Sequence, residues 1–455
     1  MSKSLTRISE IIEEISMGPF GSDIKVESFV SEGVPVLNGS NLTNFKLVED
    51  EFKYVTAEKA KTFRKAIAKR GDIVITHRGT LGQISYIPDN SKFDEYVISQ
   101  SQFRVGLNRK LVDPAFFVYY FHTSEGQKRL LSNKCHVGVP ALAQATTNFK
   151  LVEIPLPSLP TQEKIAFVLS ALDSKIELNH RINAELEAMA KTLYDYWFVQ
   201  FDFPNEDGKP YRASGGKMVW NEELRRAIPE GWKVQKMAEW IDLDKSGDWG
   251  KDKEEANFTK KVICFRGADI NGLNGLAELK PPVRYILEKN SFKILKSHDL
   301  IIEISGGSPT QSTGRLAFIT DATIKRFEHP LICSNFCKPV TMRNKKLLYN
   351  FVYNWSSLYD NGVFFGFEGK TSGIKNLLFD SFISSYYTVV PEERIVDKFY
   401  DIIDSIQEKK QTALAENQKL AELRDWLLPM LMNGQVKVKN VKEIDLLMAI
   451  EQKSK

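Results

Sequence analysis

Two segments of this 455-residue sequence follow a similar pattern with shared landmarks, although they lie far apart in the chain. One long segment with periodic apolar residues opens with Leu159-Pro160-Thr161-Gln162-Glu163, and another opens with Val390-Pro391-Glu392-Glu393-Arg394. Asp173-Ser174 recurs as Asp404-Ser405, and Asn183-x-x-Leu186 recurs as Asn417-x-x-Leu420. Internal repeats of this kind dictate the architecture of a chain. The sequence therefore predicts a duplicated unit of globular domain plus long helix, with two similar faces held at a fixed distance.

The first copy predicts a helix from about residue 161 to residue 199. Apolar and small residues recur there at alternating spacings of four and three, which is a heptad seam. The seam consists of Ile165, Leu169, Leu172, Ile176, Asn179, Asn183, Leu186, Ala190, Leu193 and Trp197. Such a helix is roughly 58 Å long at 1.5 Å per residue, so it needs a long partner. Its two asparagines are either solvated positions of a loose coil or a buried pair that fixes the register.

The second copy predicts a helix from about residue 392 to residue 432. Lys410 and Arg424 interrupt its seam, Pro429 should kink its last turns, and Asn433-Gly434 should end it. The seam consists of Val396, Phe399, Ile403, Ile406, Ala413, Asn417, Leu420, Leu427 and Leu431. Two long seams in one chain pair most simply with each other, as an antiparallel coiled coil.

The remaining sequence mixes short strands and helices in two regions that resemble each other. Gly71-Asp72-Ile73-Val74-Ile75 matches His298-Asp299-Leu300-Ile301-Ile302, and Arg7 to Ile11 matches Lys236 to Trp240. We also match Ser101-Gln102-Phe103 with Ser334-Asn335-Phe336. The sequence thus predicts an α/β (mixed α+β) protein with a pseudo-twofold internal repeat. Its segments are a first globular domain (1–159), a first long helix (160–200), a linker (201–231), a second globular domain (232–388), a second long helix (389–434) and a tail (435–455).

Bulk composition excludes several classes of protein. Four scattered cysteines are too few for a disulfide framework, which favours a reducing cytoplasm. No apolar run approaches the 18 residues or so that cross a membrane, and the first residues do not resemble a signal peptide. The net charge of +4 is compatible with nucleic acid without indicating it.

Catalytic signatures are missing from the sequence. Gly369-Lys370-Thr371 resembles the end of a P-loop, but the required first glycine is Phe364. The Asn/Asp-Pro-Pro-aromatic motif of amino-methyltransferases is absent, and the histidines form no metal-binding pair. We therefore expect a binding protein with no metal and no cofactor of its own.

Basic and polar segments in both globular regions are candidate nucleic-acid contacts. The stretch from Lys53 to Arg70 is either a solvated helix face or a track for phosphates, which gives salt-dependent affinity. Two glycine-containing loops, 76–83 and 305–315, follow matched strands and carry unlike polar residues. They are either ordinary glycine turns or two half-site readers, with Arg78, Gln83 and Arg315 at or near base edges. The full candidate set is Lys25, Arg64, Lys65, Lys69, Arg70, His77, Arg78, Thr80, Gln83, Lys134, His136, Arg266, Gln311, Arg315, Lys325, Arg326, Lys338, Lys370 and Thr371.

Several motifs resemble those of type I restriction-modification specificity subunits, and the resemblance covers essentially the whole chain. They lie in the long helices and the linker: residues 193–204 (LYDYWFVQFDFP), 208–211 (GKPY), 215–220 (GGKMVW), 228–232 (IPEGW) and 427–434 (LLPMLMNG). The resemblance implies that each globular region is a target recognition domain for one half of a bipartite, gapped DNA site. It also implies that the paired helices set the gap.

The same resemblance implies the partners of the chain. Two modification (methyltransferase) subunits, which bind S-adenosylmethionine and methylate adenine, would dock on the helices. Two restriction subunits, which use ATP and magnesium, would translocate and cut the DNA, and this chain would hold no active site. The alternatives are a specificity subunit of a methyltransferase-only or type II-like system, or a coiled-coil scaffold that binds protein.

Overall fold

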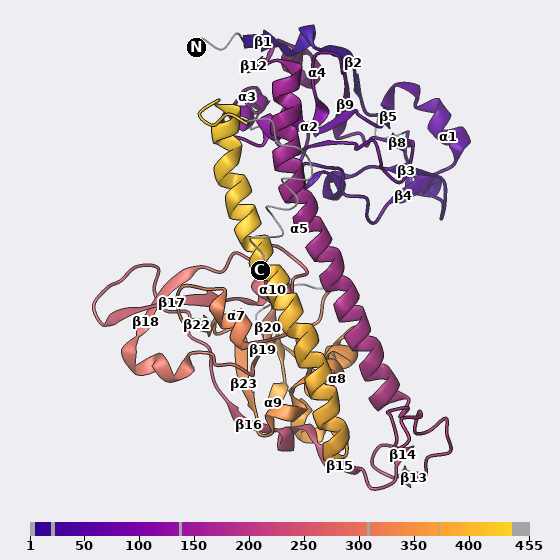
Figure 1. Cartoon of the computed structure of the whole chain (residues 1–455), viewed down its shortest axis with the longest axis vertical. Helices are drawn as coiled ribbons and strands as arrows, with labels where there is room; N and C mark the ends of the chain where they lie inside the picture. Colours follow the sequence, from indigo (N-terminus) through magenta and orange to yellow (C-terminus); the bar gives the residue numbers. More distant parts are fainter. Residues whose placement is uncertain (1–4, 20–22, 136–138, 307–309, 372, 439–455) are drawn as a thin grey trace. The chain divides into compact units, whose positions relative to one another are not determined.

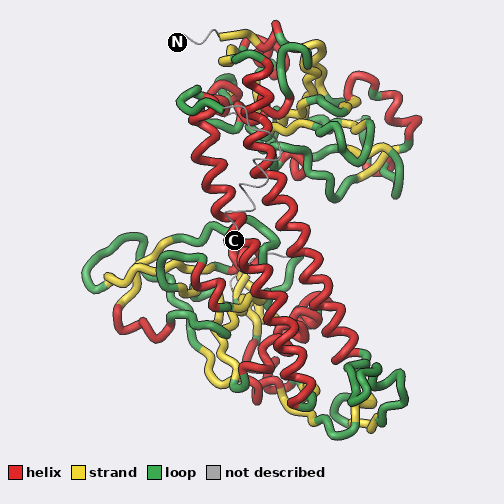
Figure 2. Tube along the Cα trace, in the orientation of Figure 1, coloured by secondary structure: helices red, strands yellow, loops and turns green. Residues whose placement is uncertain are grey.

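The computed structural model describes residues 5–19, 23–135, 139–306, 310–371 and 373–438. The chain divides into two compact units. Unit 1 comprises Met1–Lys175 and Lys419–Lys455, and unit 2 comprises Ile176–Gln418. Each unit therefore contains a strand-rich body together with part of both long helices, α5 (Leu159–Tyr194) and α10 (Glu393–Met432) (Figures 1 and 2).

Unit 1 is built on two four-stranded sheets. One is antiparallel, in the order β2 (Ile12–Met17), β9 (Gln102–Leu107), β6 (Ile73–Thr76) and β7 (Ile84–Tyr86). The other is mixed, in the order β4 (Lys53–Val55), β3 (Val34–Val36), β8 (Glu95–Val97) and β5 (Ile67–Lys69), with β3 and β8 parallel. The pairs β1 (Leu5–Arg7) with β12 (Glu153–Pro155), and β10 (Lys134–Cys135) with β11 (Ala141–Leu142), complete its strands. Its short helices are α1 (Ala57–Thr62), α2 (Pro114–Phe121), α3 (Ser124–Leu130) and α4 (Ala145–Leu151).

Unit 2 repeats the strand order of both sheets, except that its mixed sheet has no counterpart of β5 among the described strands. Its antiparallel sheet has the order β16 (Ile241–Asp244), β23 (Cys337–Met342), β19 (Asp299–Glu303) and β21 (Leu316–Phe318). Its mixed sheet has the order β18 (Val283–Leu287), β17 (Phe258–Phe265) and β22 (Leu331–Cys333), with β17 and β22 parallel. β15 (Lys233–Lys236) pairs with β26 (Tyr387–Val390), and β20 (Ser305–Gly306) joins β25 (Ile374–Leu377) and β24 (Glu368–Thr371). Its short helices are α6 (Ile270–Leu273), α7 (Asp321–Lys325), α8 (Leu348–Asp360) and α9 (Phe379–Ser385).

The backbone confirms the repeat in detail at the start of β6 and β19. The Oδ2 atom of Asp72 accepts the Lys69 amide at 2.9 Å, and that of Asp299 accepts the Lys296 amide at 2.8 Å. The residues before these aspartates, Gly71 and His298, have positive φ of 87° and 74°. Because left-handed backbone favours glycine, His298 holds a conformation that the first copy gives to a glycine.

Strand register corrects one of the matches made from the sequence. Ile73 faces Val105 in unit 1, and Leu300 faces Val340 in unit 2. Counting back from these partners without a gap aligns Ser99-Gln100-Ser101, not Ser101-Gln102-Phe103, with Ser334-Asn335-Phe336. Repeated serine and glutamine residues in Ser99 to Gln102 permitted the two-residue slip, which only the pairing resolves.

The linker contains regular structure that its turn-rich composition did not predict. Met218–Asn221 (β13) and Arg226–Pro229 (β14) form an antiparallel hairpin. Helices α2 and α3 follow each other closely but remain separate, because Thr123 caps the start of α3 through its Oγ1 atom.

Long helices α5 and α10 contact each other along the predicted seams within each unit. In unit 1, Ile165 and Leu169 of α5 share a buried core with Leu428 and Leu431 of α10. In unit 2, Ala190, Tyr194 and Trp197 share a core with Phe399 and Ile403. Residues later in α5 meet residues earlier in α10, so the helices are antiparallel. The remaining seam residues Leu172 and Leu420 are buried, and Ile176, Leu186, Leu193, Ile406, Ala413 and Leu427 are half-buried.

The ends of both helices differ slightly from the prediction. α5 passes at Asp195–Val199 into a π-helical turn in which Trp197 is buried. α10 continues through Pro429 to Met432, and Gly434 follows with φ of 67° and donates its amide to the Leu431 carbonyl at 3.1 Å. The predicted stop at Asn433-Gly434 is therefore confirmed.

The repeated Asp-Ser landmark joins the short helices to the long ones. Tyr119 of α2 donates its hydroxyl hydrogen to Asp173 of α5, and Tyr349 of α8 donates to Asp404 of α10 at 2.7 Å. This tyrosine–aspartate contact occurs once in each unit, so the repeated aspartate anchors the globular body to the helix that follows it.

Candidate nucleic-acid interface

The basic segment of unit 1 covers α1, β5 and the short turn between them. Lys61, Arg64 and Lys65 are exposed, and their side chains form no ion pair with the described part of the chain. Lys69 pairs with Glu95 at 3.4 Å and Arg70 with Asp94 at 3.0 Å. Exposed pairs of this kind are worth at most about 1 kcal/mol, so Lys69 and Arg70 can exchange these carboxylates for phosphates. Two further candidates in unit 1, Lys25 and Lys134, are also exposed.

The loop between β6 and β7 presents Arg78 and Thr80 to solvent. Gln83 instead points inward, where its Nε2 donates to the Gly39 carbonyl at 2.9 Å and its Oε1 accepts from Thr76 at 3.1 Å. His77 is half-buried, with Nε2 at 3.2 Å from the Gln100 carbonyl oxygen. Burial and the neighbouring Arg78 lower the pKa of His77, which favours its neutral ring.

The equivalent loop of unit 2 places Arg315 where unit 1 has Gln83. The amide of Thr76 bonds to the Gln83 carbonyl at 3.0 Å, and that of Glu303 bonds to the Arg315 carbonyl at 2.8 Å. The Arg315 guanidinium donates two hydrogen bonds to Glu303, at 2.8 and 2.6 Å, and this bonding raises the pKa of Arg315. Gln83 and Arg315 thus close the base of their loops, while Arg78 and Gln311 are exposed farther along them.

Other predicted cations of unit 2 are mostly engaged within the protein. Arg266 donates two hydrogen bonds to the buried Asp269, at 2.8 and 3.0 Å, and Lys338 forms ion pairs with Asp244 and Asp380. The Nη1 of Arg326 donates to Gln411 of α10 at 2.8 Å, and burial lowers the pKa of Arg326 to about 10. Lys325 is exposed in the last turn of α7. Of these four cations, only Lys325 can bind a phosphate without breaking such a contact.

Three candidate residues lie wholly or partly outside the described part of the chain. His136 lies outside the described residues, and Lys370 and Thr371 belong to β24 with side chains outside the described part.

Polar residues on the helix seams are paired across the two helices. Asn179, 3% exposed, donates its Nδ2 to Asn417 Oδ1 at 2.8 Å and to Glu416 Oε2 at 2.7 Å. Asn183 Nδ2 lies 3.4 Å from the Lys410 carbonyl oxygen. The structure therefore supports the buried-pair interpretation of the seam asparagines over the solvated one. The predicted interruptions are paired too: Lys410 with Glu187, and Arg424 with Asp173 at 2.9 Å.

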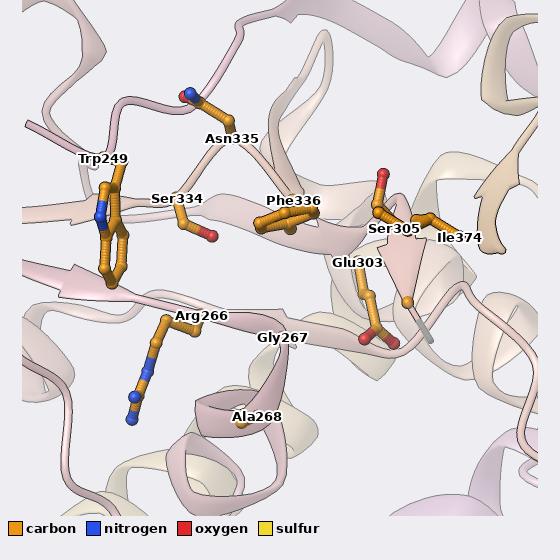
Figure 3. A pocket seen from close by; sticks show the side chains of 11 residues that line it. Trp249, Arg266, Gly267, Ala268, Glu303, Ser305, Ser334, Asn335, Phe336 and Ile374 are labelled. Atoms are coloured by element: carbon orange, nitrogen blue, oxygen red, sulfur yellow. The ribbon is translucent and has the colours of Figure 1, made fainter. Parts of the chain in front are cut away.

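A cavity of about 620 Å³ in unit 2 brings the candidate Arg266 together with residues that the sequence did not propose as DNA contacts, among them Trp249 and Asn335. Figure 3 shows Ser334, Asn335 and Phe336 along one edge of it and the segment from Arg266 to Ala268 along the opposite edge. Trp249 and Phe336 expose 37% and 53% of their surface. The Trp249 ring is stacked on the Arg284 guanidinium, 4.1 Å from the ring centre, which holds it in place.

Unit 1 has a cavity of about 390 Å³ lined by Asn38, Lys53, Ser99, Gln100 and neighbouring apolar residues. Asn38, Ser99 and Gln100 match Arg266, Ser334 and Asn335, because Val36 pairs with Val97 as Cys264 pairs with Ile332. One sequence signal was available: 97–105 (VISQSQFRV) aligns without a gap with 332–340 (ICSNFCKPV).

No described helix is both long and apolar enough to cross a membrane. Within the described ranges, no group of three or more His, Cys, Asp or Glu side chains is placed to hold a metal ion.

Comparisons with known proteins agree with this architecture. Residues 21–188 match the family model described as "Type I restriction modification DNA specificity domain". The chain is 24% identical over 430 residues to the type I restriction enzyme MjaIX specificity subunit of Methanocaldococcus jannaschii, covering 92% of this chain and 90% of that protein. It is 25% identical over 470 residues to the HindI specificity subunit of Haemophilus influenzae, covering 93% and 99%.

One solved structure has the same fold over nearly the full length. The type I restriction-modification S subunit from M. genitalium superposes with a TM-score of 0.54 and 15% identity, covering 96% of both chains. The matched domain and the two relatives make this chain similar to type I restriction-modification specificity subunits over most of its length.

Proposed function

We propose that the chain reads a bipartite, gapped DNA site, one half with each strand-rich body. The observation that carries this proposal is the repeat itself: the antiparallel sheets of the two bodies share one strand order, but the loops at matched positions differ. Loops on a common scaffold determine which ligand is recognised. Two bodies with the same scaffold and different loops therefore fit two different half-sites.

Electrostatics supports phosphate contacts in unit 1. Lys61, Arg64 and Lys65 lie on one short stretch of chain without an intramolecular ion pair among the described residues. Cations of this kind neutralise DNA phosphates and release counterions, so affinity should fall steeply as salt rises. Base selection then comes from the loops, where Arg78 and Gln311 are exposed.

We further propose that the long helices carry the partner subunits. Apolar side chains remain exposed on them, including Leu178, Ile182 and Met189 on α5, and Leu423 and Trp426 on α10. Exposed apolar residues on an otherwise polar face mark protein–protein contacts. Because the unit is repeated, the chain offers two similar docking surfaces, one for each of two modification subunits. They and two restriction subunits would bind S-adenosylmethionine, ATP and magnesium, while this chain supplies specificity without chemistry.

Single-molecule mapping of adenine methylation tests the proposal. Cells would carry the cognate modification subunit with and without this chain. We expect a gapped, two-part motif that appears only with the chain. If no motif appears although the partner is expressed and folded, the proposal is wrong, and direct DNA binding as a function of salt would be measured next.

A further inference from the structure

Both units carry a carboxamide side chain at one matched position of the fold. Gln100 occupies the turn that leads into β9, and Asn335 occupies the equivalent turn before β23. Each turn borders the cavity already described in its unit. Their neighbours have diverged, because Ser101 stands where unit 2 has Phe336, and Asn38 stands where unit 2 has Arg266.

Each turn is fixed in place by a glycine on a neighbouring segment. A Cβ atom on Gly18 would lie 1.9 Å from the Ser99 carbonyl oxygen, and one on Gly247 would lie 2.0 Å from that of Ser334. Real Cβ atoms do not approach oxygen so closely, so both positions require glycine. The close approach holds the turn against the rest of the body, and the carboxamide is therefore presented from a rigid support.

The two carboxamides are available to a ligand. Gln100 and Asn335 are exposed, and neither side chain forms a hydrogen bond within the described part of the chain. A carboxamide offers one donor and one acceptor side by side, which matches N7 and N6 of adenine in the major groove. In unit 2 the residue after Asn335 is Phe336, which also lines the cavity, and an apolar group there suits the methyl of the thymine paired with that adenine.

We propose that Gln100 and Asn335 are equivalent specificity residues, each selecting an adenine in its own half-site. The cavity beside each turn receives the edge of that A·T pair. This inference rests on the proposed function, and it assigns both readers to one structural position. The ordinary alternative is a pair of solvated amides on surface turns. It gives no reason for DNA specificity to change when either amide is altered.

Methylation maps of the assembled modification complex test the assignment. We expect Asn335→Ala to relax one adenine position in one half of the motif, with a loss of discrimination of about tenfold or more. Gln100→Ala should do the same in the other half only. Carboxylates accept from cytosine N4, so Asn335→Asp and Gln100→Glu should shift the preference at the same positions from adenine towards cytosine. Competition binding with DNA carrying each base there measures the ratios.

Phe292→Ala is the matched control, because Phe292 is 63% exposed in unit 2 and lies outside the cavity. It should leave the motif unchanged. Absence of any motif with the unaltered chain would overturn the proposed function. A normal motif that stays unchanged in both alanine variants would overturn only this inference. So would a single variant that alters both halves.

Discussion

Arg315 and Arg78 lie in equivalent loops but have opposite surroundings. Arg315 forms a bidentate ion pair with Glu303, whose side chain is buried, whereas Arg78 is exposed on its loop. Removing one partner of a buried pair leaves an uncompensated charge, while removing an exposed side chain costs little. The two arginines should therefore separate stability from recognition.

We expect Arg315→Gln to lower the free energy of unfolding by about 3 kcal/mol. Arg78→Gln should change it by less than about 0.5 kcal/mol. Urea unfolding of the full chain measures both values, and the double variant Glu303→Gln/Arg315→Gln should recover part of the loss. If Arg315→Gln leaves the free energy of unfolding unchanged, the pair contributes no stability.

Arg78→Ala should weaken binding by about 1–3 kcal/mol at one half-site only. DNA with each half-site altered separately measures this. Uniform weakening on all DNA would assign Arg78 to a phosphate, and unchanged binding would remove it from the interface.

His122 should make unit 1 sensitive to acid. Burial, and to a smaller extent Arg424, lower the pKa of His122 below its usual 6.5, and one ring nitrogen lies 2.9 Å from the Ile84 carbonyl oxygen. Because the unfolded chain takes up the proton first, this contribution to stability is complete above pH 6.5 and is lost as the pH falls towards the folded-state pKa. Thermal unfolding between pH 7.5 and about 5 should show a smaller loss for His122→Gln than for the unaltered chain. If the two chains lose the same stability between these pH values, His122 does not cause the sensitivity to acid.

At the scale of the elements, the buried asparagine pair between α5 and α10 should specify how the helices align. Asn417→Leu removes the Oδ1 acceptor of Asn179 and should cost about 1–3 kcal/mol. Asn179→Leu/Asn417→Leu replaces a polar pair by an apolar one, so its stability should return to near that of the unaltered chain. Denaturant unfolding separates the two cases. Equal stability of all three chains would show that the pair does not constrain the seam.

Periodicity predicted the helices and most of their buried positions, since a seam repeats locally along the chain. It also marked Lys410 and Arg424 as interruptions, because their partners Glu187 and Asp173 lie more than two hundred residues away. The same limit applies to the candidate DNA contacts. Whether Arg315 or Lys338 is free depends on carboxylates contributed by other elements, which spacing along the sequence does not show.

The cavities were missed for a related reason. Their edges come from segments separated in sequence, such as Trp249, Arg266 and Asn335, which only the strand pairing brings together. The duplicated scaffold was predictable because its two copies retain similar strand sequences. Contacts that differ between the copies leave no such internal signal.

At the scale of the whole molecule, the proposed role of the long helices is to set the gap between the half-sites. A seven-residue insertion preserves the heptad seam and lengthens a helix by about 10.5 Å. With base pairs spaced at about 3.4 Å, the preferred gap should grow by roughly three base pairs. The insertion belongs in both helices, between Lys175 and Ile176 and between Gln418 and Lys419, where the chain passes from one unit to the other.

Methylation mapping of the lengthened chain measures the gap directly. We expect both half-site sequences to remain unchanged while the gap lengthens, because the bodies that read them are untouched. Seven residues inserted in the turn between β13 and β14 provide the control, since that hairpin lies outside both long helices. If the half-site sequences change and the gap does not, the helices do not act as a ruler. The gap would then have to be set by the strand-rich bodies or by the partner subunits.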